Sequence, residues 1–230
     1  MILKLYQKLD DALSYLSGNS INEKIFLKKY FKKKEIVYVD IGTNEGSYLE
    51  FLTNNLKISR VFCFEPAKNL FLQLKNNYKN NFVIENYAVS NKNSIKKFYE
   101  YKISSQSSLY QQNKIFPSLE KIKTKYNVKT ISLDSYFFKK KNIVIDFCKI
   151  DTQGEEKKIL IGMEKLLKKK KIKLLKIELQ FSELYKNCGS NYLDIINYLK
   201  NKHYKLITFT KPKFKDNKVL FLDAFFEIEK

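Results

Sequence analysis

The chain has 230 residues, of which 44% are hydrophobic and 15% aromatic, so it can bury the core of one domain and is not a disordered polymer. Its formal net charge is +20, but Arg60 is the only arginine and the lysines are spread along the whole chain. Proteins that recognise phosphate groups or nucleic-acid bases favour arginine, so the charge alone does not establish a nucleic-acid interface. No run of about 18 uncharged apolar residues predicts a membrane-spanning helix. Charged residues within the first sixteen positions argue against a secretory signal, and we expect a cytoplasmic protein.

The cysteines and the histidine predict neither a disulfide framework nor a zinc site. Cys63, Cys148 and Cys188 are odd in number and have no paired spacing. Cys63 and Cys148 lie within apolar runs, where a buried thiol is usual. His203 is the only histidine, so a His/Cys metal site is not expected.

Residues 1–34 predict a helical extension, with one amphipathic helix followed by a second that runs through Tyr30. The apolar face of the first helix recurs at helical spacing and consists of Ile2, Leu5, Tyr6, Leu9, Leu13 and Leu16. This face can pack on the following domain, form a dimer contact or lie on a membrane surface. The sequence leaves these three alternatives open, and with them the oligomeric state.

From residue 35 to residue 230, short apolar strands alternate with helical patterns, which is typical of a parallel sheet built from β-α-β units. Strands are expected at 36–41, 60–65, 82–86, 144–150, 173–179, 204–209 and 220–228. Helices are expected at 47–56, 68–78, 155–169 and 191–200. The last strand follows a polar turn that contains proline, so it should run antiparallel. The expected fold class is α/β, a seven-stranded, mostly parallel sheet with an antiparallel last strand and helices on both faces.

Residues 94–138 fall outside this alternation and predict an insertion in the domain. Two strands are expected in it, at 95–101 and 128–133. The polar stretch 104–108, which contains four serines, predicts a mobile loop or lid between them.

Ligands of open α/β sheets bind beyond the carboxyl ends of the strands, so residues that end strands are candidates for the site. The first strand ends in Asp40 and leads into a loop that contains Gly42, Asn44, Glu45 and Gly46. The glycines permit a tight turn and a close approach of ligand to backbone. The two acidic residues would repel a diphosphate, whereas they suit a ligand that carries an amino-acid group and no phosphate. This pattern favours S-adenosylmethionine over NAD or ATP.

The next two strand ends carry groups that suit an adenosyl ligand. Glu65, followed by Pro66, can accept hydrogen bonds from both ribose hydroxyls, although many acidic strand ends only cap a helix. The third strand leads into Asn86 and Ala88, where the amide or the adjacent backbone could meet the adenine edge.

Three further carboxylates end the fourth and fifth strands. Asp151 and Glu155 flank a strand-to-helix turn, and Glu178 ends the following strand. Asp151 and Glu155 can cap and stabilise the helix, or they can face the methyl donor and the acceptor. If all three face one cleft, they could deprotonate a hydroxyl or bind a hard divalent cation, although no metal is predicted. Asp151 is the first candidate for a base and Glu178 the second, because His203 lies away from the ligand edge.

Five motifs resemble, in order and spacing, the successive signatures of FkbM-type methyltransferases. They are DIGTNEG at 40–46, FEP at 64–66, NYAVS at 86–90, ISLD at 131–134 and KIDTQGE at 149–155. The resemblance covers about residues 35–227 and includes Gly162. It implies a Rossmann-like methyltransferase fold that uses S-adenosylmethionine, in a family whose members commonly methylate hydroxyl oxygens on sugars or natural-product scaffolds.

The resemblance also implies roles for individual residues. The expected cofactor-binding residues are Asp40, Gly42, Asn44, Gly46, Glu65, Pro66, Asn86, Ala88 and Asp151. The expected catalytic residues are Asp151, Glu155 and Glu178. The sequence departs from the family pattern at Thr43, where alanine is frequent, at Glu45, which adds a charge, and at Thr152 and Gln153, where Val-Glu is more usual.

The leading hypothesis is an O-methyltransferase that acts on a sugar, a glycan or a natural-product-like acceptor in polysaccharide biosynthesis. An RNA methyltransferase or a nucleic-acid-binding protein is the alternative that the charge of +20 suggests. The absence of an arginine-rich stripe, of an appended RNA module and of an Asn-Pro-Pro-Tyr-like motif argues against it. A third alternative is a module that binds the cofactor without turnover.

Overall fold

The computed structural model describes residues 21–115, 121–140 and 143–229 of the chain. The predicted helix between Ile2 and Leu16 lies outside these ranges. Within the described ranges, no helix combines the length and the apolar character needed to cross a bilayer.

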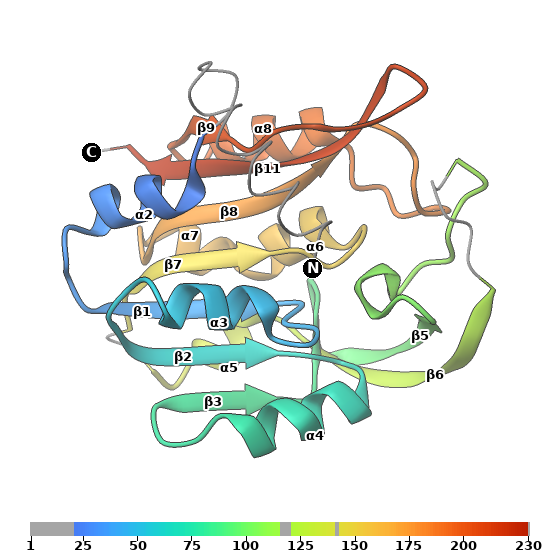
Figure 1. The fold of residues 1–230 in the computed structure, drawn as a ribbon, viewed down its shortest axis with the longest axis horizontal. Coiled ribbons are helices and arrows are strands. Elements are labelled where there is room, and N and C mark those ends of the chain that lie inside the picture. The colour runs from blue at the N-terminus through green and yellow to red at the C-terminus, as the bar shows by residue number, and fades with distance from the viewer. Residues whose placement is uncertain (1–20, 116–120, 141–142, 230) are drawn as a thin grey trace, which may run out of the picture.

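A mixed sheet of eight strands forms the centre of the molecule, in the order β10-β11-β8-β7-β1-β2-β3, with β9 paired to β11 (Figure 1). The strands are β1 Ile36–Ile41, β2 Ile58–Phe64, β3 Phe82–Glu85, β7 Ile145–Ile150, β8 Ile172–Gln180, β9 Tyr204–Phe209, β10 Lys213–Lys215 and β11 Lys218–Ile228. The five strands from β8 to β3 run parallel, whereas β11 is antiparallel to β8, β9 and β10. The predicted fold class is therefore confirmed, with all seven expected strands present.

The eighth strand, β10, corrects the expectation of a polar turn over residues 211–218. Asp216 and Asn217 both have positive φ values, +49° and +60°, and Lys215 pairs with Lys218 across them. Two consecutive residues in this conformation make the tight turn that matches the twist of a hairpin, and Asp and Asn tolerate it well. The proline in this segment therefore does not prevent a hairpin.

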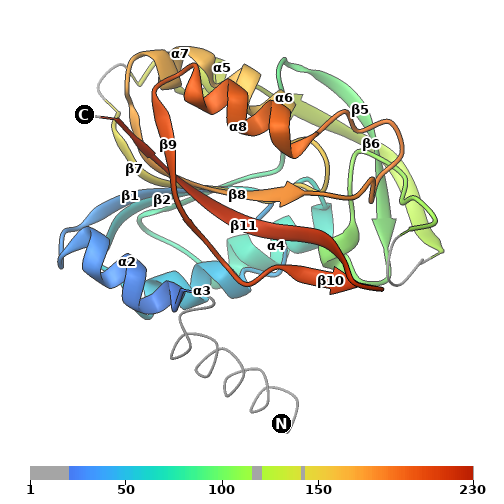
Figure 2. The ribbon, with the colours of Figure 1, turned by 90° about the horizontal axis from the view of Figure 1, so that it is seen from above.

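Helices cover both faces of the sheet (Figure 2). The side chains of β1 alternate between the two layers. One face carries α2 Glu23–Phe31, α3 Ser47–Thr53 and α4 Lys68–Asn77, and the other carries α5 Leu133–Phe137, α6 Glu156–Gly162, α7 Glu164–Lys168 and α8 Tyr192–Lys200. On β1, Ile36 and Tyr38 pack with α2 and α3, whereas Val39 and Ile41 belong to the core beneath the other helices. Burial on both faces explains why these strands read as apolar runs.

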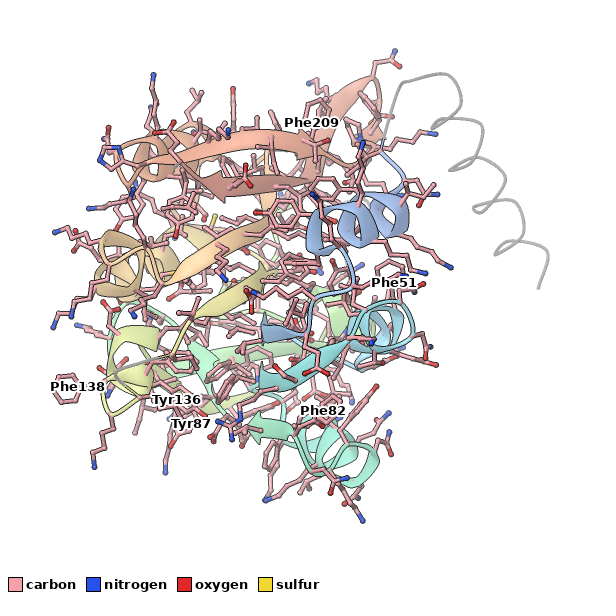
Figure 3. The ribbon with its side chains drawn as sticks, turned by 90° about the vertical axis from the view of Figure 1, so that its left-hand side faces the viewer. Phe51, Phe82, Tyr87, Tyr136, Phe138 and Phe209 are labelled. Atoms are coloured by element: carbon pink, nitrogen blue, oxygen red, sulfur yellow. The ribbon has the colours of Figure 1, made fainter. Side chains whose placement is uncertain are left out.

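Aromatic residues of α5 show which of its sides is buried. Tyr136 packs edge-on against Phe62 and Phe64 of β2, with ring centroids 6.2 and 5.0 Å apart. Phe138, directly after the helix, points away from the molecule and is 72% exposed (Figure 3).

The insertion forms, together with the short strand β4 that precedes it, a second, three-stranded sheet beside the carboxyl edge of the main sheet (Figure 1). Its strands are β4 Ala88–Val89, β5 Ser94–Tyr101 and β6 Ile122–Ile131, in the order β4-β6-β5. β6 begins six residues before the strand expected at 128–133, because it pairs along the whole of β5. The short 3-10 helix η1, Ser104–Gln106, follows β5.

The expected helix at 155–169 is two helices, α6 and α7, which meet at Met163. The end of α6 lies against the chain after β4: a Cβ on Gly162 would stand 2.1 Å from the backbone oxygen of Ser90. Glycine is required there by close approach of two backbones rather than by its own φ angle.

We expect Gly162→Ala to lower the free energy of unfolding by roughly 3 kcal/mol, because the added methyl group forces two backbones apart. In an ordinary helix the same change would stabilise. Gly189→Ala is the control, since a methyl group there would have no atom within 4 Å and only the φ of +64° opposes the change, at about 1 kcal/mol. Urea unfolding measures both, and equal losses would contradict the prediction.

Candidate functional site

A cavity of about 230 Å³ lies at the carboxyl ends of β1, β2 and β7, between these strands and the insertion. The arrowheads of the three strands point toward β5 and β6 in Figure 1. The predicted site residues that line it are Gly42, Asn44, Glu65, Pro66, Ala88, Asp151 and Glu155. Asp40, Gly46, Asn86 and Glu178 are not among its lining residues.

The loop after β1 brings the backbone of two parallel strands into contact. Gly42 has a φ of +79°, and a Cβ there would stand 1.9 Å from the backbone oxygen of Asp151. Gly46, with a φ of +87°, begins α3 and faces Leu74 of α4, so its role is in packing the loop rather than in lining the cavity. Both glycines occupy a conformation that side chains rarely adopt.

Glu65 lies at the end of β2 and is 4% exposed. Its Oε2 accepts a hydrogen bond from the backbone N–H of Asn44, and its Oε1 accepts one from the N–H of Ala67, each at 2.8 Å. Burial raises the pKa of Glu65 to about 7, against the opposing effect of these two donors. Because a carboxylate oxygen has two lone pairs, each oxygen of Glu65 can still accept a hydrogen bond from a hydroxyl group in the cavity.

Apolar side chains form one wall of the cavity, beyond Glu65. Leu70, Ala88, Phe98 and Leu109 line it and pack in one cluster. Asn86 instead fixes the neighbouring loop, because its Nδ2 donates to the backbone oxygens of Glu65 and Pro66 at 2.9 and 3.0 Å. Phe98 and Leu109 belong to the insertion, and no spacing in the sequence pointed to them.

Lys149 connects the ends of β1 and β7 although it is buried at 6% exposure. Its Nζ lies 3.6 Å from Oδ1 of Asp40 and 3.3 Å from Oδ2 of Asp151, and it donates to the backbone oxygen of Gly42 at 3.3 Å. Asp40 is fully buried, and burial raises its pKa despite the nearby ammonium. The signal for Lys149 was a lysine between apolar residues of a buried strand, because a buried lysine needs an anionic partner.

Asp151 combines an ionised carboxylate with access to the cavity. Its side chain is 34% exposed, and its Oδ1 accepts from Nε2 of Gln153 at 2.8 Å. Burial alone would raise its pKa, but Lys149 and Gln153 outweigh it and lower the pKa of Asp151 below the ordinary value.

Glu155 lines the cavity, yet its oxygens are held by neighbouring side chains. It is 1% exposed and accepts from Oγ of Ser90 and from Nζ of Lys96, each at 2.5 Å. The Tyr110 hydroxyl donates to its other oxygen, and Nζ of Lys158 lies 3.8 Å away. Glu155 therefore ties the insertion to the start of α6.

Glu178 lies deeper, on β8, at 6% exposure. It accepts from Nε2 of Gln180 at 3.0 Å, and burial and the charge of Asp151 raise its pKa well above the ordinary value. Glu178, Asp151 and Glu155 thus stand in different surroundings. In the part of the chain that the structure describes, no group of three His, Cys, Asp or Glu side chains is placed to hold a metal ion.

The insertion covers the cavity through contacts with both strand-end loops. Oγ of Ser104 in η1 donates to Oε1 of Glu45 at 2.8 Å, and Oγ of Ser108 donates to the backbone oxygen of Gln153 at 2.7 Å. The stretch 104–108, expected as a loop or lid, contributes three serines to the lining.

We expect Lys96→Met to lower the free energy of unfolding by about 2 kcal/mol, because it removes the closest cation from the buried carboxylate of Glu155. Lys97→Met is the matched control: Lys97 is the next residue of β5, is exposed, and faces away from Glu155. Urea unfolding at neutral pH compares them. Equal losses would mean that the contact with Glu155 adds no stability.

Comparisons with known proteins agree with this architecture. Residues 40–206 match the family model described as the methyltransferase FkbM domain. The crystal structure of methyltransferase FkbM from Methylobacillus flagellatus superposes with a TM-score of 0.54 at 16% identity, over 83% of this chain and 43% of that one. Magnesium protoporphyrin IX methyltransferase from Synechocystis, with bound S-adenosylmethionine, gives 0.50 at 9% identity, over 90% and 76%. The chain thus spans less than half of the first protein, and no curated protein matches its sequence.

Proposed function

Because the chain belongs to the methyltransferase FkbM family, whose methyl donor is S-adenosylmethionine, we propose that it transfers a methyl group to a hydroxyl oxygen of a sugar, glycan or natural-product-like acceptor. The single observation that carries this proposal is that Glu65 and Asp151 line the same cavity. Glu65 is placed to accept hydrogen bonds from two hydroxyl groups, and Asp151 is ionised and accessible. Such a reaction belongs to polysaccharide or natural-product biosynthesis.

The residues of the cavity fit a cationic, phosphate-free adenosyl ligand. Glu65 has free lone pairs for the two ribose hydroxyls, and the apolar wall around Ala88 and Phe98 suits a flat ring. At the strand ends the charged lining side chains, such as Glu45, Glu65 and Asp151, are acidic, and the lining cations, Lys102 and Lys123, belong to the insertion. A diphosphate on the loop after β1 would need cations or clustered backbone N–H groups there. Gly42 leaves room for the backbone to approach the ligand.

The donor, when bound, supplies a methyl carbon that is already electrophilic, so the protein's main task is to align an acceptor oxygen with it. Asp151 would accept the hydrogen bond of the acceptor hydroxyl and take its proton while the new carbon–oxygen bond forms and the carbon–sulfur bond of the donor breaks, with its electron pair left on the sulfur. Lys149 keeps Asp151 ionised and oriented from behind. Ser104 and Tyr101 of the insertion line the cavity and would limit the access of water to the bound donor.

The roles of the other predicted residues follow from their surroundings. Glu155 is held by two cations and two hydroxyls, so it serves as an anchor for the insertion beside the transferred methyl. Glu178, whose pKa burial raises well above the ordinary value, does not line the cavity and would not face the acceptor directly. Asp40 acts on the methionine end through Lys149 and Gly42 rather than by contact.

The test measures binding and transfer separately. Calorimetry should show binding of S-adenosylmethionine but not of NAD or ATP. Labelled methyl should then pass from S-adenosylmethionine to a fraction of a glycan or metabolite extract and appear there as a methyl ether. Transfer to RNA alone, with a steep dependence on salt, would support the RNA methyltransferase instead. Binding of a phosphate-bearing nucleotide in place of S-adenosylmethionine would overturn the proposal.

A further inference from the structure

Gln153, at the turn between β7 and α6, makes polar contacts with four other residues. Its Nε2 donates to Oδ1 of Asp151 at 2.8 Å and lies 3.3 and 3.4 Å from the two oxygens of Glu178. Its Oε1 accepts from the hydroxyl of Tyr185 at 2.8 Å. Its backbone oxygen accepts from Oγ of Ser108 at 2.7 Å. One side chain thus joins two carboxyl groups and a tyrosine on three segments of the chain.

Only a carboxamide satisfies this set of partners. The carboxyl groups of Asp151 and Glu178 need a donor between them, and the tyrosine hydroxyl needs an acceptor on the other side. Glutamate, the more usual residue of the family pattern at this position, would offer no donor and would add a third negative charge. The positive φ of Gln153, +61°, is a conformation that glutamine rarely adopts, so its contacts hold the turn in place.

The charges around this pair come from five elements. Lys149 on β7 and Lys176 on β8 favour the ionised form of Asp151, while Asp40 on β1, Glu156 on α6 and Asp223 on β11 add negative charge. Asp151 is 34% exposed, whereas Glu178 is 6% exposed. Burial and the charge of Asp151 therefore disfavour the ionised form of Glu178, whereas the more exposed Asp151 has the lowered pKa.

We propose that Gln153 is a positioning residue for methyl transfer: by bridging Asp151 and Glu178 it fixes a single negative charge on the carboxylate that faces the cavity. This inference rests on the proposed role of Asp151 as the base. Without the bridge, Asp151 loses the donor to its Oδ1 and keeps only the contact of its Oδ2 with Lys149. With glutamate at this position, three acidic groups compete for the same space.

The experiment follows the titration of Asp151 in protein labelled with ¹³C at aspartate carboxyl carbons, with the resonance assigned by Asp151→Asn. In the wild type the signal should remain at the ionised position down to about pH 4. Gln153→Glu should raise its midpoint by about one pH unit or more, and Gln153→Met by less, because it removes the donor without adding charge. Gln111→Glu, which adds the same charge at an exposed position, should leave Asp151 unchanged.

Transfer assays complete the test, with circular dichroism to confirm that each variant is folded. Gln153→Glu should shift the acidic limb of the kcat profile to higher pH by the same interval as the midpoint. Unchanged midpoints in both Gln153 variants would overturn the inference. A shifted midpoint together with full transfer by Asp151→Asn would instead show that the bridge exists and that the proposed base is wrong, so the two failures are distinguishable.

Discussion

Glu65→Ala should weaken the binding of S-adenosylmethionine by about 100-fold or more. The change removes a carboxylate that can accept two ribose hydroxyls, and each charged hydrogen bond contributes roughly 1.5–3 kcal/mol. Calorimetry at pH 8 measures the loss. Glu85→Ala is the matched control, because Glu85 ends the neighbouring strand β3 and is not among the residues that line the cavity.

The same residue predicts how the binding of the donor depends on pH. The pKa of Glu65 is raised to about 7 by burial, so the free protein holds a proton there at lower pH. Hydrogen bonds from the two ribose hydroxyls favour the ionised form of Glu65, so binding of the donor should release that proton. Affinity should then fall below pH 7 by up to about tenfold per pH unit and level off above it. Equal affinity at pH 6 and pH 8 would contradict this role for Glu65.

The raised pKa also has a consequence for stability in the absence of the donor. The native state binds this proton more tightly than the unfolded chain, in which the pKa of the glutamate has its ordinary value of 4.5. This contribution to stability is fully present below about pH 4.5 and is lost as the pH rises to about 7. The donor should therefore raise the melting temperature more at pH 8 than at pH 6.

Asp151→Asn should lower kcat by about 100-fold or more, while the affinity for S-adenosylmethionine changes by only a few-fold. The amide preserves the shape of the carboxylate but cannot take the proton of the acceptor hydroxyl. Single-turnover transfer of labelled methyl to the acceptor fraction measures the effect. Asp146→Asn is the control, since Asp146 lies at the opposite end of β7, paired with Lys34 and Lys173.

Transfer at the wild-type rate by Asp151→Asn would remove Asp151 from the proposed mechanism. Loss of donor binding as severe as the loss of transfer would make Asp151 a binding residue rather than a base. The loss of methyl transfer compared with the loss of donor binding therefore decides the role of Asp151.

Hydrophobic periodicity predicted the parallel sheet because each buried strand, such as β1, is apolar on both faces and is followed by a helix. It did not predict β10, whose three residues alternate too briefly, nor the break of the expected helix at Met163. That break lies next to Gly162, where the contact is with Ser90, 72 positions earlier in the chain. Contacts between distant segments leave no local pattern in the sequence.

In the candidate site, too, some features could be predicted from the sequence and others depend on contacts between distant segments. The order of strand ends placed Gly42, Glu65 and Asp151 at one edge, because parallel strands end on the same side of a sheet. The charge state of each carboxyl group was not readable from its position. Lys149 lowers the pKa of Asp151, burial raises the pKa of Glu178, and Lys96 from the insertion forms an ion pair with Glu155.

The order of amino acids alone was enough to predict the α/β class, the family pattern and the edge of the sheet at which the chemistry is expected. These follow from short-range periodicity and from residues that end strands, which are properties of neighbouring positions. Which acidic groups line the cavity, and which are anchored, became visible in the folded chain, since burial and ion pairing depend on segments such as β5 and β8 that lie far apart in the sequence. An acid's charge is set by the groups that surround it in space, and those groups come from many positions along the chain.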